Sequence, residues 1–90
     1  MEYIITFKNT NFAIKAEQCL LENKFQVSVL PLPSQISAGC GICLRIKQDE
    51  IQAVIKTLTE KNIDDIGLFS RTTENNRFSY DEVNYRRLLT

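Results

Sequence analysis

Cys40 and Cys43 are the residues of this sequence best suited to chemistry, and they lie three positions apart. A deprotonated cysteine is a strong nucleophile that attacks disulfides and other sulfur compounds. Gly39 and Gly41 flank Cys40, and glycine lets another molecule approach the backbone closely. We therefore take Cys40 as the candidate nucleophile; the alternative is an inert buried cysteine that only fills space.

The same two cysteines have the CxxC spacing of thiol redox proteins. In thioredoxin-like proteins this pattern begins a helix, whereas here it falls on a predicted strand. Side chains three apart on a strand point to opposite faces, so a disulfide between Cys40 and Cys43 would need a bulge or an irregular turn at Gly41. We favour two independent thiols and keep a thiol redox pair as an alternative.

Two polar residues near the cysteines could bind a ligand or support a thiolate. Ser37 could donate to a thiolate or a bound anion, although loop serines commonly satisfy their own turn. Arg45 shares strand parity with Cys43 and could bind an anion or a partner carboxylate; the alternative is a solvated or cross-strand-paired arginine. Cys19 lies among the apolar positions of a predicted helix, where we expect it only to pack. The candidate site residues are thus Cys40 and Cys43 for chemistry, with Ser37, Gly39, Gly41 and Arg45 for ligand binding.

The composition disfavours several classes of function. The chain has 11 basic and 11 acidic residues, so it lacks the positive field that attracts nucleic acids or anionic membranes. It has three cysteines and no histidine, too few ligands for a closed zinc site, and we expect no metal and no cofactor. An odd number of cysteines without an N-terminal signal segment favours reduced thiols and a cytoplasmic location.

Hydrophobic periodicity predicts an α+β domain, because apolar residues alternate in some segments and recur at helical spacing in others. The predicted order is βαββαβ. That order is typical of a ferredoxin-like sandwich, a four-stranded antiparallel sheet with two helices on one face. The predicted strands and helices are Glu2–Phe7, Phe25–Leu30, Ile42–Ile46 and Ile63–Ser70, with a helix from the caps at Asn9–Asn11 to about Asn23 and another from Gln48 to Asn62.

In this arrangement the loop before the third strand lies at the end of the sheet where the first helix begins. Pro31 and Pro33 should end pairing of the second strand and begin that loop. Cys40 should then lie beside the first turn of the first helix, with its sulfur toward the helical layer and reachable from solvent. A helix N-terminus favours the thiolate form of a nearby cysteine.

Residues 71–90 are expected to form a tail that follows a domain of residues 1–70. Arg71 to Arg77 is polar and turn-rich, which predicts a flexible connector. Ser79 and Glu82 have capping-box spacing ahead of an apolar segment, which predicts a short terminal helix. This tail either caps exposed core or frays, and the alternative is a subunit contact.

The opening EYIITFKNTNFAIKAEQCL, the order of elements, and the motif of Pro33, Ile36, Ser37, Cys40 and Gly41 with Arg45 downstream form a recognisable combination. From about Met1 to Phe69 the sequence resembles the selenium/sulfur (Se/S) carrier protein-like family. The resemblance implies a small bacterial protein linked to selenium or sulfur metabolism, in which Cys40 carries the chalcogen.

We therefore predict a carrier rather than a true catalyst, because no histidine and no clustered carboxylate pair supplies proton transfer. Cys40 would accept sulfur or selenium as a persulfide or its selenium analogue from a donor protein and pass it to an acceptor. The alternative is a ferredoxin-like interaction or regulatory module that dimerises or binds a metabolite through an open sheet face. RNA is disfavoured because that face, at Ile4, Thr6, Cys43 and Arg45, offers no aromatic stacking platform. We expect no membrane partner and allow a homodimer.

Overall fold

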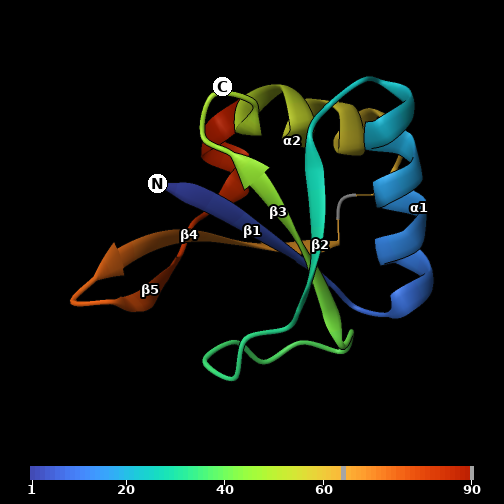
Figure 1. Cartoon of the computed structure of the whole chain (residues 1–90). Helices are drawn as coiled ribbons and strands as arrows, with labels where there is room; N and C mark the ends of the chain where they lie inside the picture. Colours follow the sequence, from blue (N-terminus) through green and yellow to red (C-terminus); the bar gives the residue numbers. More distant parts are fainter. Residues whose placement is uncertain (64, 90) are drawn as a thin grey trace.

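Strands and helices fill most of the computed structural model, which describes residues 1–63 and 65–89 (Figure 1). Asp64, in the predicted fourth strand, and Thr90, in the predicted tail, lie outside the described residues. The elements in chain order are β1 (Glu2–Phe7), α1 (Thr10–Glu22), β2 (Val27–Pro31), β3 (Ile42–Lys47), α2 (Ile51–Glu60), β4 (Ile66–Glu74), β5 (Arg77–Glu82) and the short 3-10 helix η1 (Tyr85–Leu89).

The strands form one sheet in the order β2-β3-β1-β4-β5, and each neighbouring pair is antiparallel. Both α-helices pack on the same face of this sheet (Figure 1). The predicted α+β class with two helices and an antiparallel sheet is confirmed. The predicted number of strands was wrong, since the sheet of the described residues has five strands and not four.

The fifth strand arises where a flexible connector was predicted. β4 continues to Glu74, and Asn75 and Asn76 then take positive φ angles of 52° and 63° before the chain returns at Arg77. Two residues with positive φ form the turn that matches the twist of a tight hairpin, and asparagine tolerates this conformation. The predicted connector is therefore strand and turn, and the predicted capping box at Ser79 lies within β5.

The first helix agrees closely with its prediction. Asn9 is its N-cap, and Asn9 Oδ1 accepts the Phe12 N–H at 3.0 Å. At the other end Asn23 donates from its side chain to Cys19 O at 2.7 Å, and Lys24 has a positive φ of 66° that turns the chain away. The second helix begins at Ile51 rather than at Gln48. None of the helices in the described ranges is long and apolar enough to cross a membrane.

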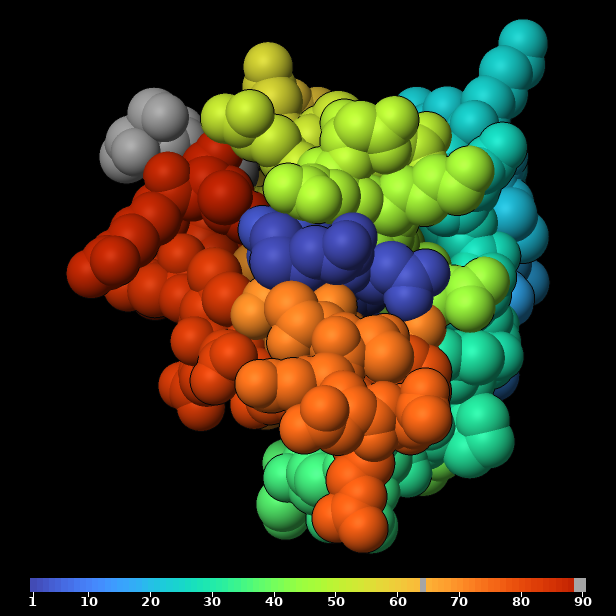
Figure 2. Space-filling view, turned by 60° about the vertical axis from the view of Figure 1, so that its left-hand side comes forward, coloured from blue at the N-terminus to red at the C-terminus, as the bar shows by residue number. Residues whose placement is uncertain are grey.

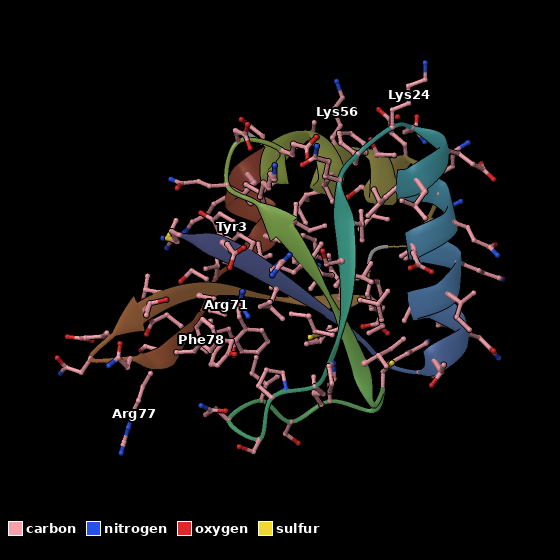
Figure 3. The ribbon with its side chains drawn as sticks, in the orientation of Figure 1. Tyr3, Lys24, Lys56, Arg71, Arg77 and Phe78 are labelled. Atoms are coloured by element: carbon pink, nitrogen blue, oxygen red, sulfur yellow. The ribbon has the colours of Figure 1, made fainter. Side chains whose placement is uncertain are left out.

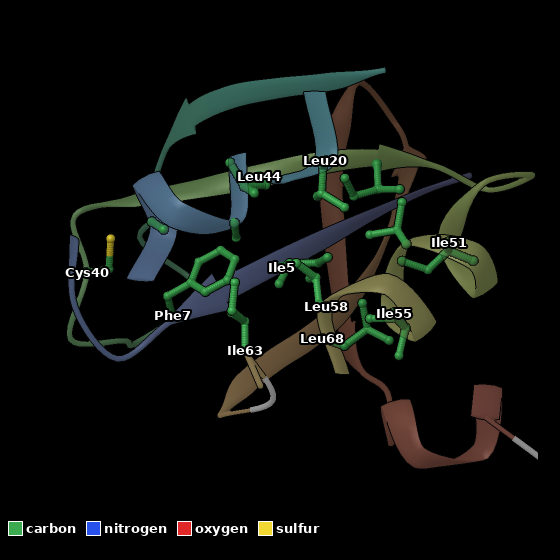
Figure 4. Packing of buried hydrophobic residues seen from close by; sticks show 14 residues of the cluster. Ile5, Phe7, Leu20, Cys40, Leu44, Ile51, Ile55, Leu58, Ile63 and Leu68 are labelled. Atoms are coloured by element: carbon green, nitrogen blue, oxygen red, sulfur yellow. The ribbon is translucent and has the colours of Figure 1, made fainter. Parts of the chain in front are cut away.

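The helix-side face of the sheet holds the main hydrophobic core (Figure 4). It joins alternate residues of the strands to the inner faces of both helices. Its fully buried members include Ile5, Leu20, Leu44, Ile55, Leu58 and Leu68. This layer fixes which side chains of β3 point toward the helices, because strand side chains alternate between faces.

The opposite face was expected to be open, and in part this was wrong. Ile4, Ile36 and Cys43 form a second buried cluster there, joined by half-buried Leu30, Leu32, Phe69 and Tyr80. The second strand ends at Pro31, which still pairs with Ile42, and the loop of residues 32–41 then returns across this face. Ile36, only 5% exposed, is the residue by which the loop packs there.

Candidate functional site

Cys40 lies in the turn before β3, at the end of the sheet where α1 begins (Figure 4). Its thiol donates to Oγ1 of Thr10, the first residue of α1, at 3.9 Å. The Ile42 N–H in turn donates to the Cys40 sulfur at 3.5 Å. The structure therefore places Cys40 beside the first turn of α1 and toward the helical layer, as the topology predicts.

The sulfur of Cys40 was expected to be reachable from solvent, and this was wrong. Cys40 is 1% exposed and belongs to the main core, at the end of the cluster that also contains Phe7 (Figure 4). The cause is the close approach of the turn to the end of β1. A Cβ atom on Gly39 would lie 2.2 Å from the Lys8 carbonyl oxygen, so only glycine lets the turn seal the sulfur here.

The two glycines beside Cys40 therefore differ in function. Gly39 is required by a contact within the chain, with the backbone of Lys8. Gly41 has no atom within 4 Å of the place where a Cβ would stand. Neither glycine has a positive φ angle. Their lack of a side chain therefore matters because of the space it leaves, and not because it permits an unusual backbone conformation.

Cys43 lies on the other face of the sheet, fully buried between Ile4 and Ile36. Its thiol donates to the Pro31 carbonyl oxygen at 3.7 Å. Burial raises the pKa of the Cys43 thiol; nearby Arg71 opposes this, and Cys40 acts in the same direction as burial. Cys43 is thus held as a protonated thiol at neutral pH.

The two thiols are free, and they belong to separate clusters on opposite faces of the sheet. This arrangement matches the expectation from strand alternation. A disulfide between Cys40 and Cys43 would require one of these side chains to leave its cluster. The two cysteines of the CxxC motif are therefore close in sequence, but their sulfur atoms lie on opposite faces of the sheet.

Arg45 lies on the same face as Cys43 and is paired across strands. Its Nη2 donates to Ser28 Oγ at 3.0 Å, and its Nε lies 3.4 Å from a Glu2 carboxylate oxygen. Glu2 also binds Arg71, which is only 8% exposed. The hydrogen bond from Arg71 is the main cause that holds the pKa of the Glu2 carboxyl below its usual value.

Sequence reasoning missed Arg71, because it assigned this residue to a connector. Arg71 lies in β4 directly opposite Glu2 of β1 and opposite Tyr80 of β5. Its guanidinium carbon is 4.2 Å from the centre of the Phe78 ring (Figure 3). The alternation of Phe69, Arg71 and Thr73 would have extended the fourth strand and placed the arginine beside the glutamate.

Ser37 is exposed and lines a different feature, a cavity of about 680 Å³. The cavity is also lined by Thr6 and Gly67 of the paired strands β1 and β4, and by Asn84 after β5. The hydrogen bonds of the Cys40 sulfur go to Thr10 and Ile42. Ser37 is therefore separate from the hydrogen-bonding partners of Cys40. Within the described ranges, no group of three or more His, Cys, Asp or Glu side chains could hold a metal ion.

Comparison with known proteins gives one match. The family model described as "Putative Se/S carrier protein-like" matches residues 2–70. The matched range contains both buried thiols and the loop of residues 32–41, and it stops within β4. No curated protein and no solved structure matches the chain significantly.

Proposed function

Since the chain belongs to the Se/S carrier protein-like family, we propose that it carries a sulfur or selenium atom on Cys40 between a donor and an acceptor protein. The observation that carries this proposal is the surroundings of the sulfur. The Ile42 N–H donates to it, and the Thr10 hydroxyl lies beside it. A hydroxyl can rotate to donate as well as accept, so both neighbours can form hydrogen bonds with a sulfur or selenium atom carried at this position.

The proposed transfer is an exchange between sulfur atoms. The Cys40 thiolate attacks the terminal sulfur of a donor persulfide, R–S–SH, and a new S–S bond forms as the donor S–S bond breaks. The donor leaves as R–S⁻ and takes up a proton, so no external oxidant or reductant is needed. With a donor of the form R–S–SeH, the same step places selenium on Cys40. An acceptor thiol reverses the reaction and leaves Cys40 as a free thiol.

Loading requires the loop of residues 32–41 to move, because the Cys40 sulfur is sealed in the described structure. In residues 1–63 and 65–89, the Cys40 thiol joins this loop to Thr10 Oγ1 of α1 at 3.9 Å, and two backbone hydrogen bonds lie within the loop. The Leu32 N–H donates to Gly41 O at 3.1 Å, and the Ile36 N–H donates to Pro33 O at 3.0 Å. Both bonds join residues at the base or within the loop, and the Ile36 side chain anchors it to the sheet. Displacing Ile36 would free the chain that leads to Cys40.

The strand order supports a ferredoxin-like arrangement for the carrier part. Without β5, the sheet reads β2-β3-β1-β4, which is the order that a βαββαβ chain with two crossovers produces. In this proposal residues 1–70 form the carrier-like part, and residues 71–90 add the rest of the hairpin and η1. Gly41 gives an approaching protein open space next to Cys40, whereas Arg45 is already engaged with Glu2 and Ser28.

Intact-protein mass spectrometry after incubation with a cysteine desulfurase and cysteine tests the proposal. We expect one added sulfur atom, removed by thiol reductants and absent in Cys40→Ser. Cys19→Ser and Cys43→Ala are the matched controls and should retain the adduct. An adduct confined to Cys19 or Cys43 would overturn the assignment. Loss of the adduct in all three variants would point to a general folding defect, which circular dichroism of each variant detects.

A further inference from the structure

β5 is the last strand of the sheet, and within the described residues only one of its edges is paired, with β4. The hairpin of β4 and β5 extends away from the helical layer (Figure 1), and its atoms lie at the surface in the turned view (Figure 2). Phe78, the second residue of β5, is 49% exposed. A free strand edge with an exposed aromatic residue is a template for pairing with another chain.

We propose that β5 pairs antiparallel with β5 of a second copy of this chain, with Ser79 of one copy opposite Ser79 of the other. The two sheets then join into one continuous sheet about a two-fold axis. This inference depends on β5 alone. It is independent of the role proposed for Cys40, which lies in the turn before β3.

The direction of the backbone groups restricts the register. The Val83 N–H, just after β5, donates to Leu68 O of β4 at 2.8 Å. Backbone groups alternate in direction along a strand, so those of Arg77, Ser79 and Asp81 also point to β4. The N–H and C=O groups of Phe78 and Tyr80 therefore point to the free edge, where each must pair with another outward-pointing residue. A two-fold axis must then pass through a residue position of β5 and not between two residues, because only this places outward-pointing groups opposite each other.

Among the registers that satisfy this condition, those with the axis at Ser79 or Tyr80 pair the most residues of β5, and charge selects between these two. With the axis at Ser79, Arg77 of each copy lies opposite Asp81 of the other, and Phe78 lies opposite Tyr80. With the axis at Tyr80, Phe78 lies opposite Glu82 and Arg77 opposite Val83. The first register makes two pairs of opposite charge and two aromatic pairs, which are stabilising cross-strand pairs. The second register makes neither.

The charged side chains of this strand lie at the surface, where a second strand would meet them. Arg77 and Asp81 are exposed, and Arg77 points away from the body of the molecule in Figure 3. The Phe78 and Tyr80 rings are already neighbours on the other face, with centroids 6.5 Å apart. Arg71 stacks on Phe78 from within the same chain. Pairing of the two copies would place the Phe78 and Tyr80 rings of both chains in one continuous row.

A second copy fits this edge better than it fits the opposite edge of the sheet. That edge is β2, which ends in Pro31. Proline has no N–H to donate and is found at strand edges that remain unpaired. β5 contains no proline, and its own sequence supplies both members of each charge pair. The self-complementarity of Arg77–Asp81 is the reason to propose a copy of this chain rather than another protein.

Charge reversal tests the register by sedimentation equilibrium over a range of protein concentrations. Wild type should dimerise reversibly. Arg77→Asp places two Asp–Asp pairs across the axis, and Asp81→Arg places two Arg–Arg pairs, so each should weaken dimerisation about tenfold. The double variant Arg77→Asp, Asp81→Arg restores opposite charges and should recover wild-type association. A wild type that stays monomeric at all concentrations overturns the proposal, as does a dimer that neither reversal weakens.

Disulfide trapping tests the axis itself. In a Cys19→Ser background, Ser79→Cys should give a crosslinked dimer on mild oxidation, because directly opposed non-hydrogen-bonded residues lie about 4.5 Å apart at Cα and disulfides accept this distance. Arg77→Cys is the matched control; it faces Asp81 and should crosslink poorly with itself. Equal mixing of Arg77→Cys with Asp81→Cys should instead give a crosslinked heterodimer. Efficient self-crosslinking of Arg77→Cys without crosslinking of Ser79→Cys would overturn the register.

Discussion

Cys40 and Cys43 are close in sequence and both are buried, but their sulfur atoms have different hydrogen-bonding surroundings. The Cys40 sulfur accepts the Ile42 N–H at 3.5 Å and its thiol donates to Thr10 Oγ1 at 3.9 Å, whereas the Cys43 thiol donates to the Pro31 carbonyl oxygen at 3.7 Å. The Cys40 sulfur thus both accepts and donates a hydrogen bond, whereas burial raises the pKa of the Cys43 thiol and its acceptor also favours the neutral form. Two cysteines of one short segment can therefore be suited to different chemistry without any difference in exposure.

The difference follows from where each residue lies on β3. Cys43 is inside the strand, between the two flanking strands β1 and β2, and it has apolar neighbours on its face. Cys40 precedes the strand, in a turn whose backbone groups are not all used in the sheet. A cysteine inside a paired strand has packed apolar neighbours, whereas a cysteine in an irregular turn lies near backbone N–H groups that can donate to its sulfur atom. Substitutions in the turn and in the strands should therefore affect the two thiols differently.

The largest effect is expected at the turn that seals Cys40. Gly39→Ala would place a methyl group 2.2 Å from the Lys8 carbonyl oxygen, and because both partners are backbone, the turn must shift. We expect a loss of about 3 kcal/mol in the free energy of unfolding, measured by urea denaturation. Gly41→Ala is the matched control and should change stability by less than about 0.5 kcal/mol, because its Cβ would meet no atom within 4 Å. Equal stability of the two variants would contradict this account.

Much of the Cys40 site could be predicted from the sequence, because it depends on topology. The strand and helix patterns were strong, and a βαββαβ order fixes which loop lies beside the start of α1. The same alternation placed Cys40 and Cys43 on opposite faces. Burial of Cys40 could not be predicted in this way, because it depends on a single close approach between the backbones at Gly39 and Lys8. Contacts of this kind join residues that no local pattern relates.

The Cys43 side of the sheet was harder to predict. The loop of residues 32–41 has no periodic pattern, so Ile36 gave no signal that it would pack on the sheet. The Asn75–Asn76 turn was hidden within a polar segment that composition assigned to a connector, although the two asparagines are a hairpin signal. Because this hairpin was not predicted, Arg71 was assigned neither to a strand nor to a partner. The sequence therefore contained a local signal for a turn, but the polar composition of the whole segment led to the prediction of a connector.

Loosening the loop should make both thiols reactive together. Ile36→Ala removes the side chain that packs on Ile4 and Cys43, and should lower the free energy of loop opening by about 2 kcal/mol. Labelling of both Cys40 and Cys43 by a thiol reagent should then rise about 30-fold, since 1.4 kcal/mol is a factor of ten in an equilibrium constant. Mass spectrometry with peptide mapping separates the two sites. Gln35→Ala, in an exposed position of the same loop, is the control; acceleration at Cys43 alone would show that the loop does not open as one unit.

Alkaline pH should test the neutral state of Cys43. Because the pKa of the Cys43 thiol is raised in the folded protein, its contribution to stability is complete below the unfolded pKa and is lost as pH rises through the folded pKa. Wild type should therefore lose stability above pH 9, the ordinary value for the thiol, by up to about 1.4 kcal/mol per pH unit from this group. Cys43→Ala should show a shallower decline in urea denaturation at the same pH values. Parallel declines in the two proteins would assign the loss to other groups.

The smallest effect is expected in the ion-pair network on the Cys43 face. The pKa of the Glu2 carboxyl is lowered, mainly by its hydrogen bond from Arg71, so Glu2 stabilises the fold above its ordinary pKa of 4.5 and loses this effect as pH falls through the lower folded value. The Glu2 side chain is 37% exposed, and solvent screening limits its contribution to less than about 1 kcal/mol. Glu2→Gln keeps an acceptor for Arg71 and removes the charge, so it should reduce stability slightly at neutral pH and flatten the acid dependence.

Lys8 and Asp65 form an exposed pair 3.5 Å apart, and Asp65→Asn is the matched control that should leave the acid dependence unchanged. A steeper acid dependence in Glu2→Gln than in wild type would contradict the stabilising role assigned to the Glu2 carboxylate.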